Sequence, residues 1–401
     1  MAGLQGKKIL VGVTGSIAAF KAAAWVHALV KEEAEVTVVM TRAATRFVSA
    51  LTFAALSGNR VHVDMFGDDP GQALAHIDLG READLVLIAP ATANTMARLA
   101  HGLADDLLAT AVLAAAGKPV LLCPAMNSGM YSHPATQENL NRLRALGYIL
   151  IEPDCGRLAC GDEGQGRLPE WERAREEILH ALIVQDLAGR QVLITAGPTR
   201  EPLDPVRYFS NRSSGKMGYA LARTARRRGA RVILITGPVA LPPPPGVEVI
   251  RVETAGEMHD AVMGVRDQAA IIVKAAAVAD FRPERREDEK IKKHQASLSL
   301  ELAANADILA ELGRTRREGQ VLVGFAAESG NLEEEGRRKL LEKNLDLVAV
   351  NDITRPDAGF DVETNQVLLI DRAGSRSLPL MSKEETANAI WDHVLGLPPR
   401  R

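Results

Sequence analysis

The sequence predicts an α/β protein built from two open sheets, and three observations lead to this prediction. Short apolar runs alternate with longer helical stretches along the chain, as expected for parallel strands joined by helices. The alternation stops after a helical stretch that ends near Val184 and starts again at Arg190. The chain has 401 residues, of which 46% are hydrophobic and 25% charged, so it is long enough for two domains with separate cores.

In the first half, each expected strand is followed by a helix. Helices are expected from Ser16, near Ala44, after Asn94 and near Gln137. Because a helix separates each strand from the next, the strands are expected to pair in parallel. The expected strands are residues 7–13, 35–40, 84–90 and 118–125.

The second half repeats this organisation from Arg190 onward. Helices are expected after Gly215 and near Met258, and the proline run 242–245 predicts a connecting loop. The expected strands are residues 190–199, 231–238, 247–252, 269–277, 320–328 and 345–351.

The seam between the halves falls within residues 185–189, with no linker rich in serine, proline or glycine to mark it. We assign residues 1–186 to a first domain and residues 187–401 to a second. Both are Rossmann-like open sheets in this interpretation, and such sheets bind ligands at the carboxyl ends of their strands.

The composition excludes several classes of protein. Lysine and arginine number 48 against 51 acidic residues, and this net charge of -3 gives no bulk attraction to nucleic acid or to an anionic membrane. Three cysteines make no disulfide framework. The chain opens directly into a strand pattern, and no apolar run approaches 18 residues, so we expect a cytoplasmic protein.

A glycine-rich turn after the first strand is the first candidate binding site. Gly12 and Gly15 follow the strand and Ser16 opens the expected helix, so backbone N–H groups there suit a phosphate. The segment lacks the third glycine of a dinucleotide fingerprint, and a purely structural tight turn remains an alternative. Thr41 ends the second strand, and the third ends in APATANT, which holds Pro90, Thr92 and Asn94.

Three further residues of the first half carry possible chemistry. His76 is as compatible with an ordinary imidazole as with a functional one. Asn127 follows a strand in an apolar frame, which suits either a turn or a carboxylate or amide ligand. Cys160 lies in the glycine-rich stretch 156–167, which indicates a mobile lid that carries a reactive thiol; Cys123 is expected in the core. A zinc site formed by Cys123, His133, Cys155 and Cys160 is a weak alternative, because structural zinc sites favour closer spacing.

These motifs together resemble the phosphopantothenoylcysteine decarboxylase family of FMN-dependent enzymes. The similar segments, in order, are GSIAAFK, AHIDL, APATANT, HGLADDLL, PAMNSGMY and LACGDEGQGR, spread over nearly all of residues 6–180. The resemblance implies a flavodoxin-like domain in which the cysteine moiety of the substrate is oxidised, decarboxylated and reduced again. It further implies His76 as base, Asn127 as substrate-orienting residue and Cys160 as proton donor. The implied FMN-binding residues are Gly15, Ser16, Thr41, Pro90, Thr92 and Asn94.

The second half has its densest polar stretch at residues 195–223. Ser213, Ser214 and Gly215 lead into an expected helix and form a second possible anion site. Arg207 and Asn211 precede it and suit a carboxylate or an acyl intermediate, although a solvated loop remains possible. Asp280 is expected at a strand end, followed by a basic cluster with Lys290, Lys292 and Lys293, from which one lysine could reach a triphosphate.

This half resembles bacterial, CTP-using phosphopantothenate–cysteine ligase over roughly residues 187–398, chiefly in PVRYFSNRSSGKMG and in the pairing of AAAVADF with KIKK. The resemblance implies an acyl-cytidylate intermediate, Mg²⁺, and catalytic roles for Asn211, Arg207 and Lys290. Ala306 stands where the family commonly has proline, and Lys274 where a small or apolar residue is expected. The implied CTP-binding residues are Lys274, Ala275, Ala276, Asp280, Lys290, Asn305, Ala306, Asp307, Ile308, Phe325, Lys339 and Lys343.

The two resemblances together imply a bifunctional enzyme of coenzyme A biosynthesis. Its substrates would be 4'-phosphopantothenate, cysteine and CTP, with phosphopantothenoylcysteine passing from the ligase to the decarboxylase. The families imply a homo-oligomer with trimeric flavin domains and dimeric ligase domains. Two alternatives are a flavoprotein binding or regulatory subunit, against which His76, Asn127 and Cys160 argue, and a peptide-cysteine decarboxylase, against which the ligase half argues.

Overall fold

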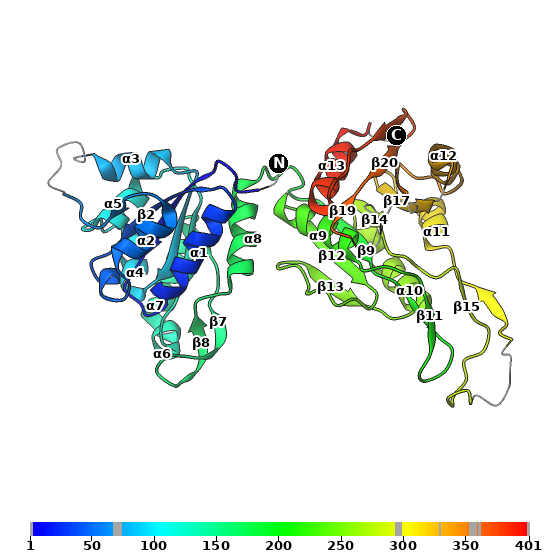
Figure 1. Ribbon diagram of the computed structural model, residues 1–401, viewed down its shortest axis with the longest axis horizontal. Coiled ribbons are helices and arrows are strands. Elements are labelled where there is room, and N and C mark those ends of the chain that lie inside the picture. The colour runs from blue at the N-terminus through cyan, green and yellow to red at the C-terminus, as the bar shows by residue number, and fades with distance from the viewer. Residues whose placement is uncertain are drawn as a thin grey trace. The chain divides into compact units, whose positions relative to one another are not determined.

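Two units with separate cores make up the computed structural model. It describes residues 3–66, 74–292, 299–328, 330–352, 359 and 362–398. One unit is Gly3–Ile183, and the other is Val184–Arg401 with the first two residues of the chain. Each is an open sheet with helices on both faces (Figure 1), parallel throughout in the first unit and mostly parallel in the second, which confirms the expected α/β architecture.

The sheet of the N-terminal unit has six strands in the order β3-β2-β1-β4-β5-β6, all parallel. The order reverses between β1 and β4, which places the carboxyl ends of these two strands at a topological switch point. The strands are β1 Lys8–Val13, β2 Glu35–Met40, β3 Val61–His62, β4 Leu85–Ala91, β5 Val120–Pro124 and β6 Ile149–Leu150.

Helices cover both faces of this sheet because neighbouring strand residues point to opposite sides. In β1, Ile9 and Val11 pack against α1 Ala19–Lys31, α2 Ala50–Ser57 and α8 Trp171–Leu182. Leu10 packs with the opposite layer. That layer contains α3 Ala75–Glu82, α4 Ala93–His101, α5 Leu107–Ala114 and α7 Pro134–Ala145, and the short segments η1 Ala44–Arg46 and α6 Ser128–Ser132 complete the unit.

Two local expectations for this unit were wrong. The first helix begins at Ala19 rather than at Ser16, because residues 16–18 form a turn in which the Ser16 hydroxyl accepts from the backbone of Ala18. The glycine-rich stretch, expected to be a loop rather than a packed element, also contains regular structure: β7 Asp154–Arg157 and β8 Glu163–Arg167 form an antiparallel hairpin. Only the connection between these strands, which carries Cys160, is irregular.

The sheet of the C-terminal unit has eight strands in the order β13-β12-β9-β14-β17-β18-β20-β21. The first six are parallel, whereas β20 and β21 add an antiparallel edge that the sequence did not predict. The strands are β9 Gln191–Ala196, β12 Arg231–Thr236, β13 Glu248–Arg251, β14 Ile271–Lys274, β17 Val321–Glu328, β18 Leu347–Asp352, β20 Val367–Ile370 and β21 Ser375–Ser377.

Two helices cover one face of this sheet and three cover the other. Helices α10 and α13 begin with capping boxes, in which Thr254 with Glu257, and Ser382 with Glu385, satisfy the first backbone N–H groups. The first face carries α9 Lys216–Arg227 and α13 Lys383–Gly396; the second carries α10 Ala255–Val265, α11 Ile308–Thr315 and α12 Leu332–Glu342, with η3 Arg266–Gln268 after α10.

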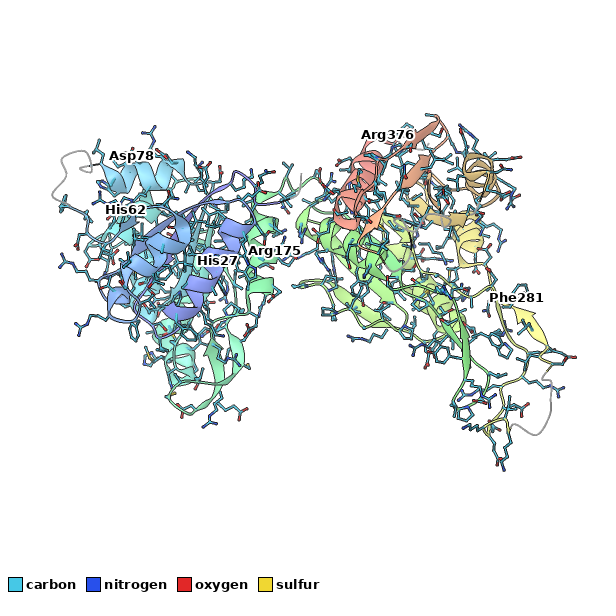
Figure 2. The ribbon with its side chains drawn as sticks, in the orientation of Figure 1. His27, His62, Asp78, Arg175, Phe281 and Arg376 are labelled. Carbon is cyan, nitrogen blue, oxygen red and sulfur yellow. The ribbon has the colours of Figure 1, made fainter. Side chains whose placement is uncertain are left out.

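Small two-stranded sheets extend from the C-terminal unit. The extension includes Tyr208, Phe209, Leu302 and the labelled Phe281 of Figure 2, all with exposed side chains. Strand β14 ends at Lys274, so Asp280 lies in the connection to β15 and not at a strand end as expected. The paired strands are β10 Arg200–Pro202 with β11 Tyr208–Ser210, β15 Phe281–Pro283 with β16 Leu302–Ala304, and β19 Thr364–Asn365 with β22 Met381–Ser382.

Within the described part of the chain, no helix has the length and apolar character needed to cross a membrane.

Candidate active sites

The turn after β1 lies very close to the loop after β2. An added Cβ at Gly15 would lie 2.5 Å from the Cβ of Ala43, so glycine is required where the two loops meet. Thr14, a buried residue that the sequence analysis missed, donates its hydroxyl to the carbonyl of Pro90 at 2.6 Å and accepts from the backbone N–H of Thr92 at 3.1 Å. The ends of β1 and β4 are therefore tied together.

Polar groups of three strand ends meet at this edge. The Thr92 hydroxyl caps α4 by accepting from the backbone of Thr95, and Asn94 is exposed in the first turn of that helix. The backbone N–H of Thr41 bonds to the carbonyl of Val13, which joins the end of β2 to that of β1. The edge thus offers hydroxyls, a carboxamide and a helix N-terminus, a donor set suited to a phosphate.

Asn127 and Cys160 lie together although 33 residues separate them. The Asn127 Nδ2 is 3.2 Å from the Cys160 Sγ and donates to Asp162 Oδ2 at 2.8 Å, while its Oδ1 accepts from the backbone of Gly129. The thiol also lies 3.3 Å from the same Asp162 oxygen. Asp162, which the sequence analysis did not select, therefore holds both predicted residues in one cluster.

Close packing positions the hairpin against the loop of Asn127. The backbone N–H of Met126 donates to the Gly166 carbonyl at 3.0 Å. A Cβ at Gly166 would lie 2.1 Å from the Met126 carbonyl oxygen, so only glycine permits this approach. The rest of the hairpin gives the Cys160 turn a fixed base.

His76 is not part of the cluster around Asn127 in this chain. It lies at the start of α3, and Figure 1 shows α3 and the β7–β8 hairpin at opposite ends of the N-terminal unit. Its Nδ1 is buried and has no hydrogen-bond partner among the described residues. A buried ring nitrogen without a partner is unfavourable, which makes it a candidate to bind a missing group.

A cavity of about 520 Å³ lies at the carboxyl edge of the sheet of the C-terminal unit. Most of the site residues predicted for this half line this cavity. The lining residues that had been predicted are Asn211, Lys274, Ala275, Ala276, Asp280, Asn305, Ala306, Asp307, Ile308, Phe325, Lys339 and Lys343.

The start of α9 forms one wall of the cavity. Gly215 precedes the helix with φ +77°, a left-handed conformation that favours glycine. A Cβ at Gly218 would lie 2.5 Å from the Cβ of Ala196, so glycine lets α9 pack closely on β9. The carboxamide of Asn211 donates to the carbonyl of Val278, which ties this wall to the connection after β14.

Ion pairs arrange the opposite wall, formed by α11 and α12. Asp307 caps α11 and pairs with Lys343 at 2.8 Å, and Lys339 pairs with Glu328. Burial opposes ionisation of Asp307, but the hydrogen bonds from Lys343 and from the Ala310 backbone keep the pKa of this carboxyl below its ordinary value. The two ion pairs therefore hold both lysine side chains at the cavity wall.

Lys274, the residue that departs from the expected pattern, ends β14 and is half-buried in the cavity. Burial lowers the pKa of its ammonium group to about 8, and the like charge of Lys343 adds to this effect. The carboxylates of Asp307 and Asp280 act in the opposite direction without cancelling it.

Arg207 and Lys290 do not line the cavity, but they belong to one substructure. Asp204 is buried and accepts from the backbone N–H groups of Val206, Arg207 and Ile291. The Arg207 guanidinium bonds to the carbonyl of Ile291, the residue after Lys290. Burial alone would raise the pKa of Asp204, but these backbone donors hold it below its usual range. A buried carboxylate thus fixes the base of the segment that carries Lys290; Lys293 lies outside the described residues.

The cavity also contains polar residues that the sequence analysis missed. Asn351 is the penultimate residue of β18 and is 8% exposed, and its Oδ1 has no hydrogen-bond partner among the described residues. Asn365 and Lys383 line the same wall. The end of the strand at 345–351 could have indicated Asn351, whereas nothing local marked Asn365 or Lys383, which come from distant elements.

A second cavity, of about 460 Å³, lies at the amino ends of β1 and β2. His62 and Asp78, both labelled in Figure 2, are among its lining residues. Burial and the nearby charge of Arg60 lower the pKa of His62. This cavity lies at the strand edge opposite Gly15, Thr41 and Thr92, and residues of α3, the helix that carries His76, line part of it.

Cys123 is fully buried in β5, as expected, and burial raises the pKa of its thiol. In the described ranges, no three His, Cys, Asp or Glu side chains lie together as a metal site would require.

Comparison with known families divides the chain in the same way as its two cores. Residues 2–183 match the family described as Flavoprotein. Residues 187–397 match the DNA/pantothenate metabolism flavoprotein C-terminal domain.

Several relatives match along their whole length. Coenzyme A biosynthesis bifunctional protein CoaBC of Bacillus subtilis (strain 168) is 47% identical, with 98% of each chain covered. The protein of the same name from Escherichia coli (strain K12) is 44% identical, with 98% of this chain and 97% of that protein covered. A solved structure of the C-terminal domain of a CoaBC protein is 41% identical and covers 52% of this chain and 95% of its own, with a TM-score of 0.45.

Proposed function

The chain belongs to the CoaBC family of bifunctional coenzyme A biosynthesis proteins, and we propose how its two halves divide the work. It is a flavoprotein and a bifunctional enzyme that ligates phosphopantothenate to cysteine and decarboxylates the product. We assign decarboxylation to residues 1–186 and ligation to residues 187–401. The observation that carries this proposal is the full-length similarity at 47% identity.

The flavin of the first half is FMN in this proposal. The donor set at the ends of β1, β2 and β4 fits its phosphate, and Gly15 leaves room where a Cβ would meet Ala43. Residues Gly15, Ser16, Thr41, Pro90, Thr92 and Asn94 would hold it. When bound, FMN supplies the reversible redox chemistry that decarboxylation of a cysteine moiety requires.

The cluster around Asn127 is suited to orient the substrate and deliver a proton. Asn127 Nδ2 already donates to Asp162 and lies near the Cys160 Sγ, so it can hold a substrate group beside the thiol. Cys160 would give its proton to the intermediate that follows loss of CO2. His76 would act as base in the oxidative step, and its place far from this cluster favours sites shared between subunits of a trimer.

The second half is proposed to use CTP with Mg²⁺. The cavity walls bring lysines from α12 and β14 and the start of α9 to one space, which suits a nucleoside triphosphate. The carboxylate of 4'-phosphopantothenate would attack the α-phosphate and release pyrophosphate, and the amine of cysteine would then displace CMP. Mg²⁺ would offset the negative charge of the triphosphate.

Asn211, Arg207 and Lys290 complete this proposal. Asn211 faces the cavity and would bind the acyl-cytidylate. Lys290 is exposed on a segment whose base is fixed by Asp204 and Arg207, so its side chain could reach a triphosphate in the cavity. We further propose dimeric ligase domains, with the exposed Tyr208, Phe209 and Phe281 as candidates for contact with a partner.

A regulatory flavoprotein subunit and a peptide-cysteine decarboxylase are less consistent with the chain. Neither reading accounts for the second domain and its cationic cavity.

One assay tests the whole proposal. Purified protein is given 4'-phosphopantothenate, cysteine, CTP and Mg²⁺, products are followed by mass spectrometry, and bound flavin is identified from its spectrum and mass. Release of CMP and pyrophosphate with accumulation of 4'-phosphopantetheine is expected. Replacing CTP with ATP tests which nucleoside triphosphate the protein uses. A protein that carries FMN but releases no CMP or AMP would contradict the ligase assignment.

A further inference from the structure

The lysines around the C-terminal cavity differ in how they are held. Five lysines line it. Lys216 pairs with Glu363 at 2.6 Å, and the ion pairs of Lys339 and Lys343 are given above. Lys383 donates to the carbonyl of Gly359 at 2.8 Å. In the described part of the chain, Lys274 alone among them has neither an ion pair nor a hydrogen bond.

The surroundings of Lys274 explain why no partner reaches it. It lies opposite Thr195 of β9 and Gly324 of β17, which carry no charge, in the middle of the sheet. Its side chain follows Ile272 to the face covered by α11 and α12. There the carboxylate of Asp307, whose charge acts on Lys274, already pairs with Lys343. A negatively charged group that neutralises Lys274 would therefore have to lie in the cavity.

A half-buried amine without a partner is the exception to a general rule. Buried charges are paired in most proteins because their desolvation is costly. Here the cost appears as the lowered pKa of about 8, so a sizeable fraction of the free protein carries a neutral amine at slightly alkaline pH. A ligand with formal negative charge would reverse this balance.

We propose that Lys274 binds a phosphate group of the nucleotide and takes up one proton from solvent when the nucleotide enters. The proton comes from water or buffer, and the neutral amine becomes an ammonium that donates to a phosphate oxygen. A phosphate is inferred rather than the base or ribose because only the phosphates of a nucleotide carry the formal negative charge that favours the ammonium. This inference rests on the proposed nucleotide-dependent ligase.

The other charged groups near Lys274 do not provide the same effect. Asp307 and Lys343 neutralise each other across α11 and α12, as Glu328 and Lys339 do between β17 and α12. Asp280, in the connection after β14, lies near enough to raise the pKa of Lys274 slightly. The titration of Lys274 should therefore dominate the pH dependence of nucleotide binding between pH 7.5 and 9.5.

Calorimetry on the full-length protein tests the proposal. CTP is titrated at fixed Mg²⁺ from pH 7.5 to 9.5, above the range where its phosphates titrate. We expect the Kd for CTP to rise toward about tenfold per pH unit above pH 8. In buffers of different ionisation enthalpy, binding near pH 8.5 should take up between half a proton and one proton, as linkage to a single group predicts.

Variants separate charge from shape. Lys274→Met keeps the length of the side chain but removes the amine, and it should weaken CTP about tenfold or more at pH 7.5 and abolish the pH dependence. Lys274→Arg is charged throughout this range and should bind more tightly than Lys274→Met at pH 9.5. Lys31→Met, an exposed lysine of the other unit, serves as the matched control.

The outcomes are distinct. A pH-independent Kd for the unchanged protein, binding without proton uptake, or wild-type affinity in Lys274→Met would overturn the inference. Cytidine, which lacks phosphate, should bind with the same affinity to Lys274→Met as to the unchanged protein; a loss as large as that for CTP would overturn the assignment to phosphate. If the unchanged protein neither binds CTP nor releases CMP, the proposed function itself fails.

Discussion

Asn127 connects two parts of the first unit that are distant in sequence. Its Oδ1 caps α6 by accepting from Gly129, so its Nδ2 is left to face the turn that carries Cys160 and Asp162. One carboxamide thus fixes the helix start and orients the thiol at the same time. The Asp162 carboxylate is the natural acceptor of the thiol proton at 3.3 Å.

Replacing Cys160 with alanine should stop the decarboxylase after loss of CO2 while ligation continues. The reason is that the proposed proton donor is removed, whereas the cavity of the other unit is untouched. Mass spectrometry should detect CO2 release and CMP formation without 4'-phosphopantetheine. Cys155→Ala, at the neighbouring exposed cysteine on β7, is the control and should be active. Full 4'-phosphopantetheine output from Cys160→Ala would exclude this role.

Asn211→Ala should separate the two half-reactions of the ligase. The amide lines the cavity and donates to Val278, so its loss should affect the acyl intermediate more than nucleotide entry. We expect pyrophosphate release to persist while the rate of phosphopantothenoylcysteine formation falls at least about tenfold. This is the effect of losing one hydrogen bond to a reacting group. The exposed Asn141→Ala serves as control. Product formation at the normal rate would contradict the assignment.

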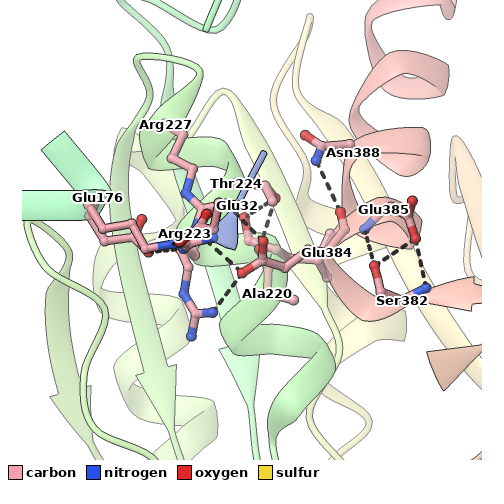
Figure 3. Close-up of polar contacts among 12 residues, drawn as sticks. Glu32, Glu176, Ala220, Arg223, Thr224, Arg227, Ser382, Glu384, Glu385 and Asn388 are labelled. Atoms are coloured by element: carbon pink, nitrogen blue, oxygen red, sulfur yellow. Dashed lines mark hydrogen bonds and ion pairs between the residues drawn. The ribbon is translucent and has the colours of Figure 1, made fainter. Parts of the chain in front are cut away.

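Among the elements, α9 and α13 are joined by a buried ionic network that supports the cavity wall. Arg227 is 1% exposed and donates to Glu384 at 2.9 Å, and Arg223 donates to the same carboxylate at 2.8 Å (Figure 3). Burial opposes ionisation of Glu384, but the two guanidinium groups lower its pKa to about 2. The start of α13 also carries Lys383, which lines the cavity.

Glu384→Gln should destabilise the C-terminal unit because Arg223 and the buried Arg227 both lose the charged carboxylate to which they donate. We expect a loss of about 2 kcal/mol in the free energy of unfolding and a fall in Tm of about 4 to 8 °C. The exposed Glu334→Gln is the control. An unchanged Tm would show that other contacts of Arg227 suffice.

The same network predicts a direction for the effect of acid. The pKa of Glu384 is lower in the folded state, so its contribution is fully present above the ordinary value of 4.5 and is lost as the pH falls toward about 2. The difference in unfolding free energy between the unchanged protein and Glu384→Gln should therefore shrink between pH 5 and pH 3, measured by urea unfolding. A difference that stays constant over this range would refute the assigned pKa.

At the scale of the whole molecule, the chain contains two units whose buried clusters are separate. The clusters of the first unit lie between residues 4 and 183, and those of the second between residues 187 and 397. A unit with its own core can unfold on its own, and a ligand stabilises only the unit that binds it.

Two thermal transitions are therefore expected, one reported by flavin fluorescence and one not. CTP at about 100 times its Kd should stabilise the second by about 2.7 kcal/mol and leave the flavin-release transition unchanged. Differential scanning calorimetry with parallel fluorescence measures both. A single transition in which CTP also delays flavin release would contradict independent unfolding.

The fold class and most of the strands follow from local patterns in the sequence. Runs such as Ile9–Val13 and Ile271–Val273 are apolar throughout because strands covered on both faces bury every side chain, and this signal is local. Sequence patterns also selected Asn127 and Cys160, which lie together, and many of the residues that line the cavity of the C-terminal unit, because polar groups at strand ends and family motifs are both read along the chain.

Which of these residues meet, and how they are charged, depends on contacts that form when the chain folds. Asp162, Asn351 and Lys383 entered the sites through contacts between distant segments, and such contacts leave no local pattern. The hairpin around Cys160 depends on the approach of Gly166 to Met126. The state of Lys274 depends on burial and on the pairing of its neighbours, since desolvation and Coulomb energies follow distances in space rather than in sequence.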